Sequence, residues 1–408
     1  MKAVRLALAG ILALCLLGII PQPSQAQDAA PDSGFFVFKS EAGWWACDQA
    51  PCTYDAPEVS GRMVSGDFNG DGLAEIAAWN FNGVGSEINV WQSTRTSFSD
   101  RTPWMTCSYP CGLNALAEGG LVAGDFDGDG KDDIAALYDY RDGDAELDVW
   151  LSAVSEFYGG ESDPWWHCGP KCYAASAVAR RLVAGDLNGD GKDDIAAMYD
   201  YGNSHSALHV WISDGSAFKY QGDNGWWWCG DGCYQASAVT GRFVAGDFDD
   251  DGKADIAAMY GYGALHVWLS TGSAFKYQGN DGWWRDGNYD AWKVTDRFVS
   301  GDFDLNGKAD IAAMRDYGDG NSQLHVWLST GSAFDYQRDQ GWWRSAENAY
   351  PASAVTGRLV AGDIDGDGRA DITGLRDYGN DHARLHVWIA ARWAPPPQQT
   401  YLPLIMKR

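Results

Sequence analysis

The chain has 408 residues, and 56 acidic against 30 basic residues give it a formal net charge of −26. Such acidity goes with disorder when aromatic residues are scarce, but here aromatic residues make up 13% and hydrophobic residues 45% of the sequence. The composition therefore excludes a disordered acidic polymer. The negative charge argues against nucleic acid and anionic membrane surfaces as partners, and it favours divalent cations.

The N-terminus has the pattern of a secretory signal peptide. Lys2 and Arg5 precede an apolar stretch over 6–20, and small residues flank Gln25. This pattern predicts residues 1–26 as a signal peptide, with cleavage after Ala26, and a secreted, extracellular protein that could associate with the cell surface. The apolar stretch is shorter than the ~20 residues of a transmembrane helix, so no transmembrane segment is expected.

Eight cysteines follow this segment, and they form four close pairs in the sequence. In an exported protein such pairs predict short disulfides. Zinc is the alternative, but the two-residue spacers and nearby histidines of zinc sites are missing. The predicted disulfides are Cys47–Cys52, Cys107–Cys111, Cys168–Cys172 and Cys229–Cys233.

An internal repeat of roughly sixty residues dominates the sequence. Each copy contains Gly-Asp-Phe/Leu/Ile-x-x-x-Gly, then a Val/Ile-Trp dipeptide, and most copies also carry a pair of adjacent tryptophans. In the third copy we expect strands at 181–184, 195–199 and 208–213, a polar loop at 186–194, and a fourth strand formed by 217–221 with the Trp pair. Four-stranded units of this length predict an all-β fold, a β-propeller.

The order of the pieces also predicts how the ring closes. The last copy stops after Trp388 and lacks the strand with Phe and Gly-Trp-Trp, which occurs instead near the front of the chain as Phe36, Phe38 and Gly43-Trp44-Trp45. We therefore expect an N-terminal strand to complete the last blade. The prediction is a six-bladed propeller over 35–391, with seven blades as the alternative, a linker over 27–34, and a Pro-rich linker with a short apolar tail over 392–408.

Each repeat contains a polar loop with side-chain oxygens at positions 1, 3, 5 and 9, and a glycine at position 6 permits a sharp turn. Position 7 would add its backbone carbonyl. An all-oxygen set with several carboxylates suits Ca²⁺, whereas Mg²⁺ keeps more of its own waters. We therefore predict about six structural calcium ions. Their candidate ligands are Asp67, Asn69, Asp71, Leu73, Glu75, Asp125, Asp127, Asp129, Lys131, Asp133, Asp186, Asn188, Asp190, Lys192, Asp194, Asp247, Asp249, Asp251, Lys253, Asp255, Asp302, Asp304, Asn306, Lys308, Asp310, Asp363, Asp365, Asp367, Arg369 and Asp371.

Two other interpretations of these loops fit less well. An EF-hand shares the first six positions but needs an acidic residue at position 12 and flanking helices, whereas position 12 here is Ala or Gly. Simple turns would also use Asp, Asn and Gly, but turns do not require acids at four fixed offsets in repeat after repeat. The spacing therefore favours calcium loops between strands.

The loops, such as Gly-Asp-Phe-Asp-Asp-Asp-Gly-Lys-Ala-Asp-Ile-Ala at 246–257, resemble FG-GAP/VCBS repeats of integrin α-subunit-like β-propellers. The resemblance covers all six units and implies metal loops between the first two strands of each blade, on one rim. It leaves the function open, because such propellers serve as adhesins, lectins and accessory domains of enzymes. Seven blades are common in that family, so six is a departure.

Aromatic residues raise the question of sugar binding. Paired tryptophans with nearby Asp and Asn could stack on sugars, but adjacent residues of a strand point to opposite faces, so packing between blades is the favoured role of at least one in each pair. Four histidines share one strand position, where Asn89 and Asp148 replace them in the first two repeats, which favours packing or hydrogen bonding. These histidines are His209, His266, His325 and His386.

The sequence contains no Gly-x-Ser-x-Gly, phosphate-binding Gly-Lys-Ser/Thr or His-Glu-x-x-His motif, so we do not expect an enzyme. The prediction is a secreted calcium-binding propeller that acts as a monomeric binding or adhesion module, lectin-like, for glycans or a cell-surface protein. The alternatives are an extracellular polysaccharide-active enzyme and a purely structural scaffold.

Overall fold

A computed structural model of the chain describes residues 34–39, 42–48, 54–81, 85–108, 116–140, 142–160, 163–318, 320–337, 341–347 and 349–392. The predicted signal peptide and the tail beyond residue 392 lie outside these residues, as do Cys52 and Cys111. Among the described residues, no helix has the length and apolarity to cross a membrane.

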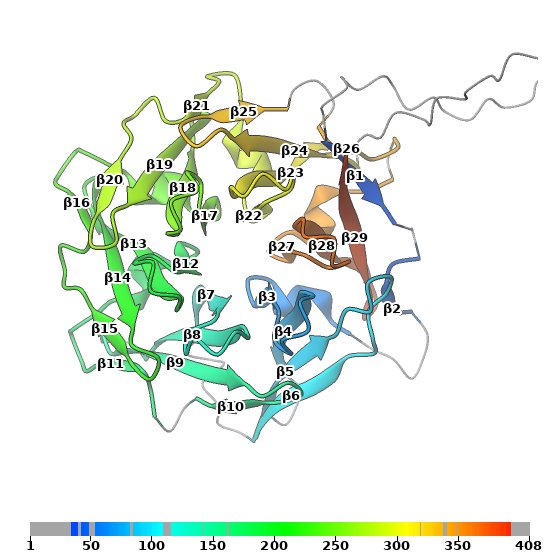
Figure 1. Ribbon diagram of the computed structural model, residues 1–408, viewed down its shortest axis with the longest axis horizontal. Coiled ribbons are helices and arrows are strands. Elements are labelled where there is room, and N and C mark those ends of the chain that lie inside the picture. The colour runs from blue at the N-terminus through cyan, green and yellow to red at the C-terminus, as the bar shows by residue number, and fades with distance from the viewer. Residues whose placement is uncertain are drawn as a thin grey trace, which may run out of the picture.

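Six antiparallel sheets stand around a common centre and form a ring (Figure 1). The prediction of an all-β, six-bladed propeller is confirmed, and the alternative of seven blades is wrong. The first strand of each blade lies innermost in the ring, and the chain runs outward through the blade before it enters the next one.

The strands have the following bounds. The first blade contains β3 (Met63–Gly66), β4 (Glu75–Phe81), β5 (Gly85–Trp91) and β6 (Thr102–Ser108). The second contains β7 (Leu116–Gly124), β8 (Asp133–Asp139), β9 (Ala145–Ser152), β10 (Phe157–Gly159) and β11 (Trp166–Cys168). The third contains β12 (Leu182–Gly185), β13 (Asp194–Gly202), β14 (His205–Ser213), β15 (Phe218–Tyr220) and β16 (Trp227–Cys229).

The fourth blade contains β17 (Phe243–Gly246), β18 (Asp255–Tyr260), β19 (Ala264–Ser270), β20 (Phe275–Tyr277) and β21 (Trp284–Arg285). The fifth contains β22 (Phe298–Gly301), β23 (Asp310–Gly318), β24 (Asn321–Ser329), β25 (Phe334–Tyr336) and β26 (Trp343–Arg344). The sixth contains β27 (Leu359–Gly362), β28 (Asp371–Gly379) and β29 (His382–Arg392), with β1 (Gly34–Phe38) and β2 (Trp45–Cys47).

Short 3₁₀ helices lead into most of the innermost strands. They are η1 (Ala56–Val59), η3 (Ala175–Val178), η4 (Ala236–Val239), η5 (Ala291–Val294) and η6 (Ala352–Val355).

The third blade shows how closely the strands follow the sequence pattern. The predicted loop ends where β13 begins, and the first three strands lie within a few residues of their predicted places. The fourth strand, however, is split into β15 and β16, which both pair with β14. A turn separates the two pieces, in which Gly225 has a φ of 56° and lies against the Leu208 carbonyl, where a Cβ atom would clash.

The ring closes as predicted. β1 pairs antiparallel with β29 over five residues, and β2 pairs with β29 further along the same strand. The N-terminal segment therefore supplies the outer strand of the sixth blade, which the C-terminal repeat lacks. In Figure 1 the blue β1 and β2 lie beside the red β29.

The core lies between neighbouring blades, and the Trp pairs belong to it. The first Trp of a pair packs on a Phe of the next blade, as Trp165 does on Phe218 with ring centres 5.3 Å apart. The second Trp packs on the fully buried tryptophan of the next blade, as Trp166 does on Trp211 at 5.4 Å. These contacts support the structural role that the sequence favoured for the pairs.

Candidate metal centres

The Asp at position 1 organises each polar loop by accepting hydrogen bonds from the loop's own backbone. Asp125 Oδ1 accepts from the amides of Gly128 and Asp129 at 2.8 and 3.0 Å, and Oδ2 accepts from Gly130 at 2.9 Å. Gly130 has a φ of 86°, which explains why position 6 is glycine. The loop is therefore built around a carboxylate at its centre.

The Asp at position 9 is the first residue of the second strand and joins the loop to the sheet. Asp133 is 1% exposed. Its Oδ1 accepts from the Ser152 amide at 2.8 Å, and its Oδ2 accepts from the Phe126 amide at 3.2 Å. Because both partners are rigid backbone, the carboxylate is held in one orientation beside the loop.

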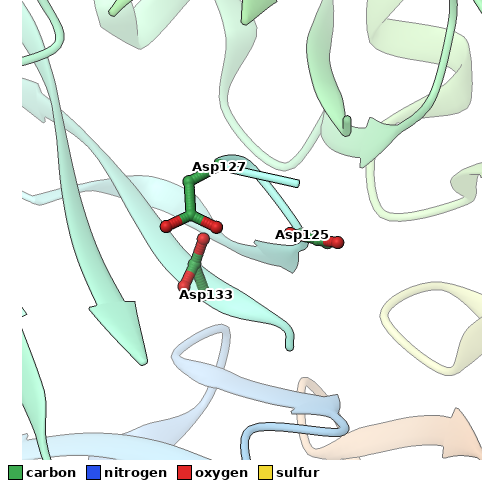
Figure 2. A group of neighbouring side chains, drawn as sticks. All are labelled: Asp125, Asp127 and Asp133. Atoms are coloured by element: carbon green, nitrogen blue, oxygen red, sulfur yellow. The ribbon is translucent and has the colours of Figure 1, made fainter. Parts of the chain in front are cut away.

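Carboxylates from the two ends of the loop converge. Figure 2 shows the side chains of Asp127 and Asp133 facing each other, with Asp125 next to them on the loop. In four of the six loops, ligand atoms of three aspartates lie within 4.8 Å of one another. These groups are Asp125, Asp127 and Asp133; Asp247, Asp249 and Asp251; Asp302, Asp304 and Asp310; and Asp363, Asp365 and Asp371.

The remaining two loops, the first and the third, carry Asn69 and Asn188 at position 3. Their position-9 acids are as buried as the others, since Glu75 and Asp194 are both 0% exposed. They keep the same backbone design, because Asp67 and Asp186 accept from the amides at positions 4, 5 and 6 of their loops. The first and third loops therefore share the position-1 arrangement of the other loops, and like the fifth loop they have three carboxylates at positions 1, 3, 5 and 9 instead of four.

A basic side chain at position 7 flanks most of the loops. Lys192 Nζ lies 2.9 Å from Asp190, Lys253 Nζ lies 2.7 Å from Asp251, and Lys131 pairs in the same way with Asp129. These ammonium groups offset part of the negative charge at position 5. The buried acids at position 9 make no such ion pair among the described residues.

Burial of several carboxylates close together raises the pKa of the position-9 acids. Loss of hydration, followed by repulsion from neighbouring acids, raises the pKa of the position-9 carboxyls well above the usual range of about 4. The pKa is raised to about 8 for Glu75, Asp133, Asp255, Asp310 and Asp371, and to about 7 for Asp194. At neutral pH these groups need a proton or a cation.

Several buried oxygens of the loops have no hydrogen-bond partner among the described residues. In the third loop these are Asn188 Oδ1 and Asp194 Oδ2, in the first Glu75 Oε1, and in the fourth Asp249 Oδ1. Buried polar atoms are normally satisfied, and each exception calls for an explanation. Unsatisfied, acceptor-only oxygens inside an oxygen-lined loop fit a hard divalent cation.

Comparison with known families agrees with this geometry. The FG-GAP-like repeat family matches residues 67–136, and the FG-GAP repeat family matches residues 178–211. Both segments contain the polar loops, and the second reaches the Val-Trp dipeptide that ends the unit. The chain is an FG-GAP repeat β-propeller. No curated protein sequence matches it.

Several solved structures are similar to this FG-GAP propeller at low sequence identity. The six-bladed lectin of Aleuria aurantia, described with a fucose recognition mode, has a TM-score of 0.42 and 12% identity, covering 81% of this chain and 93% of that one. AofleA from Arthrobotrys oligospora has a TM-score of 0.47 and 9% identity, covering 88% and 95%. A Trypanosoma rangeli sialidase has a TM-score of 0.45 and 13% identity, covering 88% and 60%. At these values no ligand or activity is carried over from them.

Sequence reasoning missed two acids at position 8 of the FG-GAP loops. Asp132 Oδ2 accepts from the Asp67 amide of the preceding loop at 2.7 Å, and Asp193 Oδ2 accepts from the Asp125 amide at 3.1 Å. Burial raises their pKa to about 6 and about 8. The signal was present in the alignment of the repeats, because position 8 is alanine in the other four.

The histidine position is structural, as predicted. His209 is 1% exposed, and its Nδ1 lies 3.3 Å from the Tyr173 hydroxyl while its Nε2 lies 2.9 Å from the Tyr201 hydroxyl. Burial lowers the pKa of His209 to about 4. The side chain is therefore a neutral hydrogen-bonding group that links neighbouring blades.

The predicted disulfides are present where they are described. Cys168 bonds to Cys172 and Cys229 bonds to Cys233. Cys47 and Cys107 are also disulfide-bonded, and their predicted partners lie outside the described residues.

Proposed function

We propose that the FG-GAP loops bind calcium and that the calcium-loaded ring is a secreted binding module for extracellular glycans. The observation that carries the first part is the convergence of loop carboxylates, together with buried position-9 acids that make no ion pair among the described residues and the unsatisfied oxygens beside them. Three or more protein oxygens per loop suit Ca²⁺ better than Mg²⁺, which keeps several of its waters. The proposed ligands are those at positions 1, 3, 5 and 9, with the backbone carbonyl of position 7.

The geometry supports a structural role for these ions. The amide at position 8 of each loop donates to the carbonyl of position 1 in the preceding loop, and all six such hydrogen bonds are present. They include Ala74 to Asp363, which joins the first blade to the last at 2.7 Å. A cation that fixes one loop therefore also fixes its neighbour.

The rim opposite to the metal loops supports the binding part of the proposal. In the third to sixth blades the second strand runs away from its loop and ends near an exposed tyrosine: Tyr201, Tyr262, Tyr317 and Tyr378 are all at least 39% exposed. Aromatic faces beside polar groups provide both stacking and hydrogen bonding, which suits sugars. The short disulfides support an extracellular location.

Thermal unfolding with millimolar Ca²⁺ and with chelator tests the first part, since extracellular calcium modules often bind at roughly 10⁻⁴ to 10⁻³ M. We expect a higher midpoint with Ca²⁺ than with chelator, and a smaller effect of equimolar Mg²⁺. Equal midpoints with and without Ca²⁺ would contradict bound structural ions.

A glycan array probed with the calcium-loaded propeller tests the second part. We expect selective binding that chelation removes. If no glycan binds while calcium still raises the midpoint, the ring is a calcium-stabilised scaffold or binds another class of ligand.

A further inference from the structure

A polar cavity of about 300 Å³ lies at the seam where the first blade meets the last. Tyr54, Asn80, Glu87 and Arg101 contribute to its lining, together with Asp381 from the turn before β29. Tyr54 belongs to both sides of the seam, because its amide donates to the Asp381 carbonyl at 2.9 Å while its ring packs on Trp91 at 5.4 Å. We call this space the seam cavity.

In the third and fourth blades aromatic side chains occupy this place. In the third blade Tyr199 stacks on His209 with ring centres 4.8 Å apart, and the hydroxyl of Tyr220 lies 3.2 Å from His209 Nδ1. Tyr173 and Tyr201 complete the cluster through hydrogen bonds to the same imidazole. The rings fill this space, and both nitrogens of the His209 imidazole have hydrogen-bond partners.

The first blade replaces this cluster with smaller, more polar groups. The strand register places Asn89 where the third blade has His209, and Asn80 where it has Tyr199. Asn89 Nδ2 donates to Asn80, and Arg101 Nη1 donates to Asn89 Oδ1 at 3.4 Å. Loss of an imidazole and a phenol ring explains why a cavity opens at this seam.

The hydroxyl of Tyr54 is left without its partner. In the third, fourth and fifth blades the corresponding tyrosines share a hydrogen bond with a histidine at 3.1 to 3.3 Å, as Tyr234 does with His266 and Tyr289 with His325. Tyr54 is 4% exposed, and its hydroxyl has no hydrogen-bond partner among the described residues. Tyr54 lines the seam cavity together with Arg101, whose guanidinium lies 5.0 Å from the centre of the Tyr54 ring.

The charge of the lining selects among ligands. Four carboxylates stand against a single guanidinium, and Arg101 lies 3.5 Å from Glu87 and over the ring of Tyr54. An anionic ligand would meet net repulsion. A ligand with an ammonium group would be attracted, and hydroxyl groups on the same ligand could bond to Tyr54 and Asn80. The carboxylates at the cavity are Asp55, Glu58, Glu87 and Asp381.

We propose that the seam cavity is a single binding site for a sugar that carries a free ammonium group, such as the 2-amino sugar glucosamine. The volume of about 300 Å³ is at the lower end of small-molecule pockets, so one sugar unit is the expected occupant. This inference rests on the proposed glycan-binding function and narrows it to one site and one class of sugar.

Titration calorimetry of the calcium-loaded protein with glucosamine, glucose and N-acetylglucosamine tests the inference. We expect one glucosamine site per chain, with glucose and N-acetylglucosamine at least tenfold weaker because they lack the charge. Tyr54→Phe should weaken glucosamine binding severalfold. Asn89→His, which inserts the side chain that other blades hold at this register, should abolish it.

Matched controls separate the site from the fold. Tyr173→Phe makes the same chemical change in a filled cluster and should leave glucosamine binding unchanged. Equal affinity for glucosamine and glucose, or full affinity in Asn89→His, would overturn the inference, as would equal binding of Nα-acetyl-lysine amide, which carries the ammonium without the sugar. Binding of other glycans on the array but not of glucosamine would overturn this inference and leave the proposed function standing.

Discussion

At the residue scale, the position-9 acids and the buried histidines have opposite effects on how stability depends on pH. The acids are more easily protonated in the folded chain than in the unfolded chain, with pKa values of about 8, or about 7 for Asp194, against about 4. The histidines are less easily protonated when folded, with the pKa of His209 and His266 lowered to about 4 by burial. Above about pH 6.5 most histidines are neutral in the unfolded state as well, so the acids dominate the pH dependence.

This gives a prediction for the metal-free protein. Between pH 6.5 and 8 the unfolded state has already lost protons that the folded state keeps, so the free energy of unfolding should fall as pH rises. With saturating Ca²⁺ the trend should weaken or reverse, because the cation replaces those protons. Thermal midpoints measured across this pH range, with chelator and with Ca²⁺, test the prediction. A midpoint in chelator that rises with pH would contradict it.

A second residue-scale feature lies at the central channel. Four repeats have a glycine with positive φ at the equivalent position of the innermost segment (Gly61, Gly119, Gly241 and Gly357), whereas Arg180 and Asp296 occupy this position with φ of 54° and 59°. The two side chains form an ion pair at 2.6 Å, and Arg180 also pairs with Glu118 at 3.0 Å. The favourable ion pair thus offsets the unfavourable backbone conformation, which costs a non-glycine residue about 1 kcal/mol.

We expect the double variant Arg180→Gly/Asp296→Gly to stay within about 1 kcal/mol of the native chain, because relief of strain offsets a partly exposed ion pair. Arg180→Gly alone should be less stable than the double variant, since it leaves the half-buried Asp296 carboxylate without this cation. Urea unfolding compares them. A double variant less stable than the single would refute this balance.

At the element scale, β1 holds the ring closed. Phe36 is 4% exposed, and its ring packs on Phe303 at 5.5 Å and on Trp342 at 5.2 Å, both in the fifth blade. Its amide also donates to the Trp342 carbonyl at 2.9 Å. A short strand from the N-terminus therefore bridges the fifth and sixth blades.

Phe36→Ala should lower the free energy of unfolding by about 3 to 4 kcal/mol, because it leaves a cavity at this junction. Tyr158→Ala on the outer strand β10 is the control, since Tyr158 is 53% exposed and should change stability by less than about 0.5 kcal/mol. Urea unfolding measures both. A Phe36→Ala loss no larger than that of the control would mean that β1 does not contribute to closure.

At the scale of the whole molecule, the loops form a connected rim. Besides the ring of position-8 hydrogen bonds, the Ser213 hydroxyl donates to the Phe126 carbonyl of the preceding loop at 2.6 Å, while the Ser213 amide donates to Asp194 at 2.8 Å. The acid at position 9 of one loop is thereby joined to position 2 of the loop before it. Ions in adjacent loops should therefore support one another.

Asp194→Asn tests this coupling. Besides weakening the third site, we expect it to lower the calcium affinity of the neighbouring loops, so that the cooperativity of a calcium titration falls and the calcium-dependent rise in thermal midpoint shrinks by more than one sixth. Asp200→Asn, on the same strand but outside the loop, is the control. Loss of a single site with unchanged binding at the others would show that the loops are independent.

Sequence alone favoured six blades over seven and predicted the strand order within a blade and the closure by the N-terminus, because each repeat carries its own local pattern and the missing strand could be found at the other end. It also located the loops, whose acids are close in the chain and need no distant partner to meet. The split of the fourth strand was missed, since it depends on how Gly225 meets β14.

Only the tertiary structure decided what the chain does between blades. The bonds of Asp132 and Asp193 to the preceding loop, and the seam cavity beside Tyr54, join residues from different repeats. No local pattern encodes such contacts, because they arise when blades of similar sequence meet with a few exchanged side chains. The repeat specifies the blades and their order. The role of a side chain that differs between repeats becomes clear only when the packing shows which residues of the next blade it contacts.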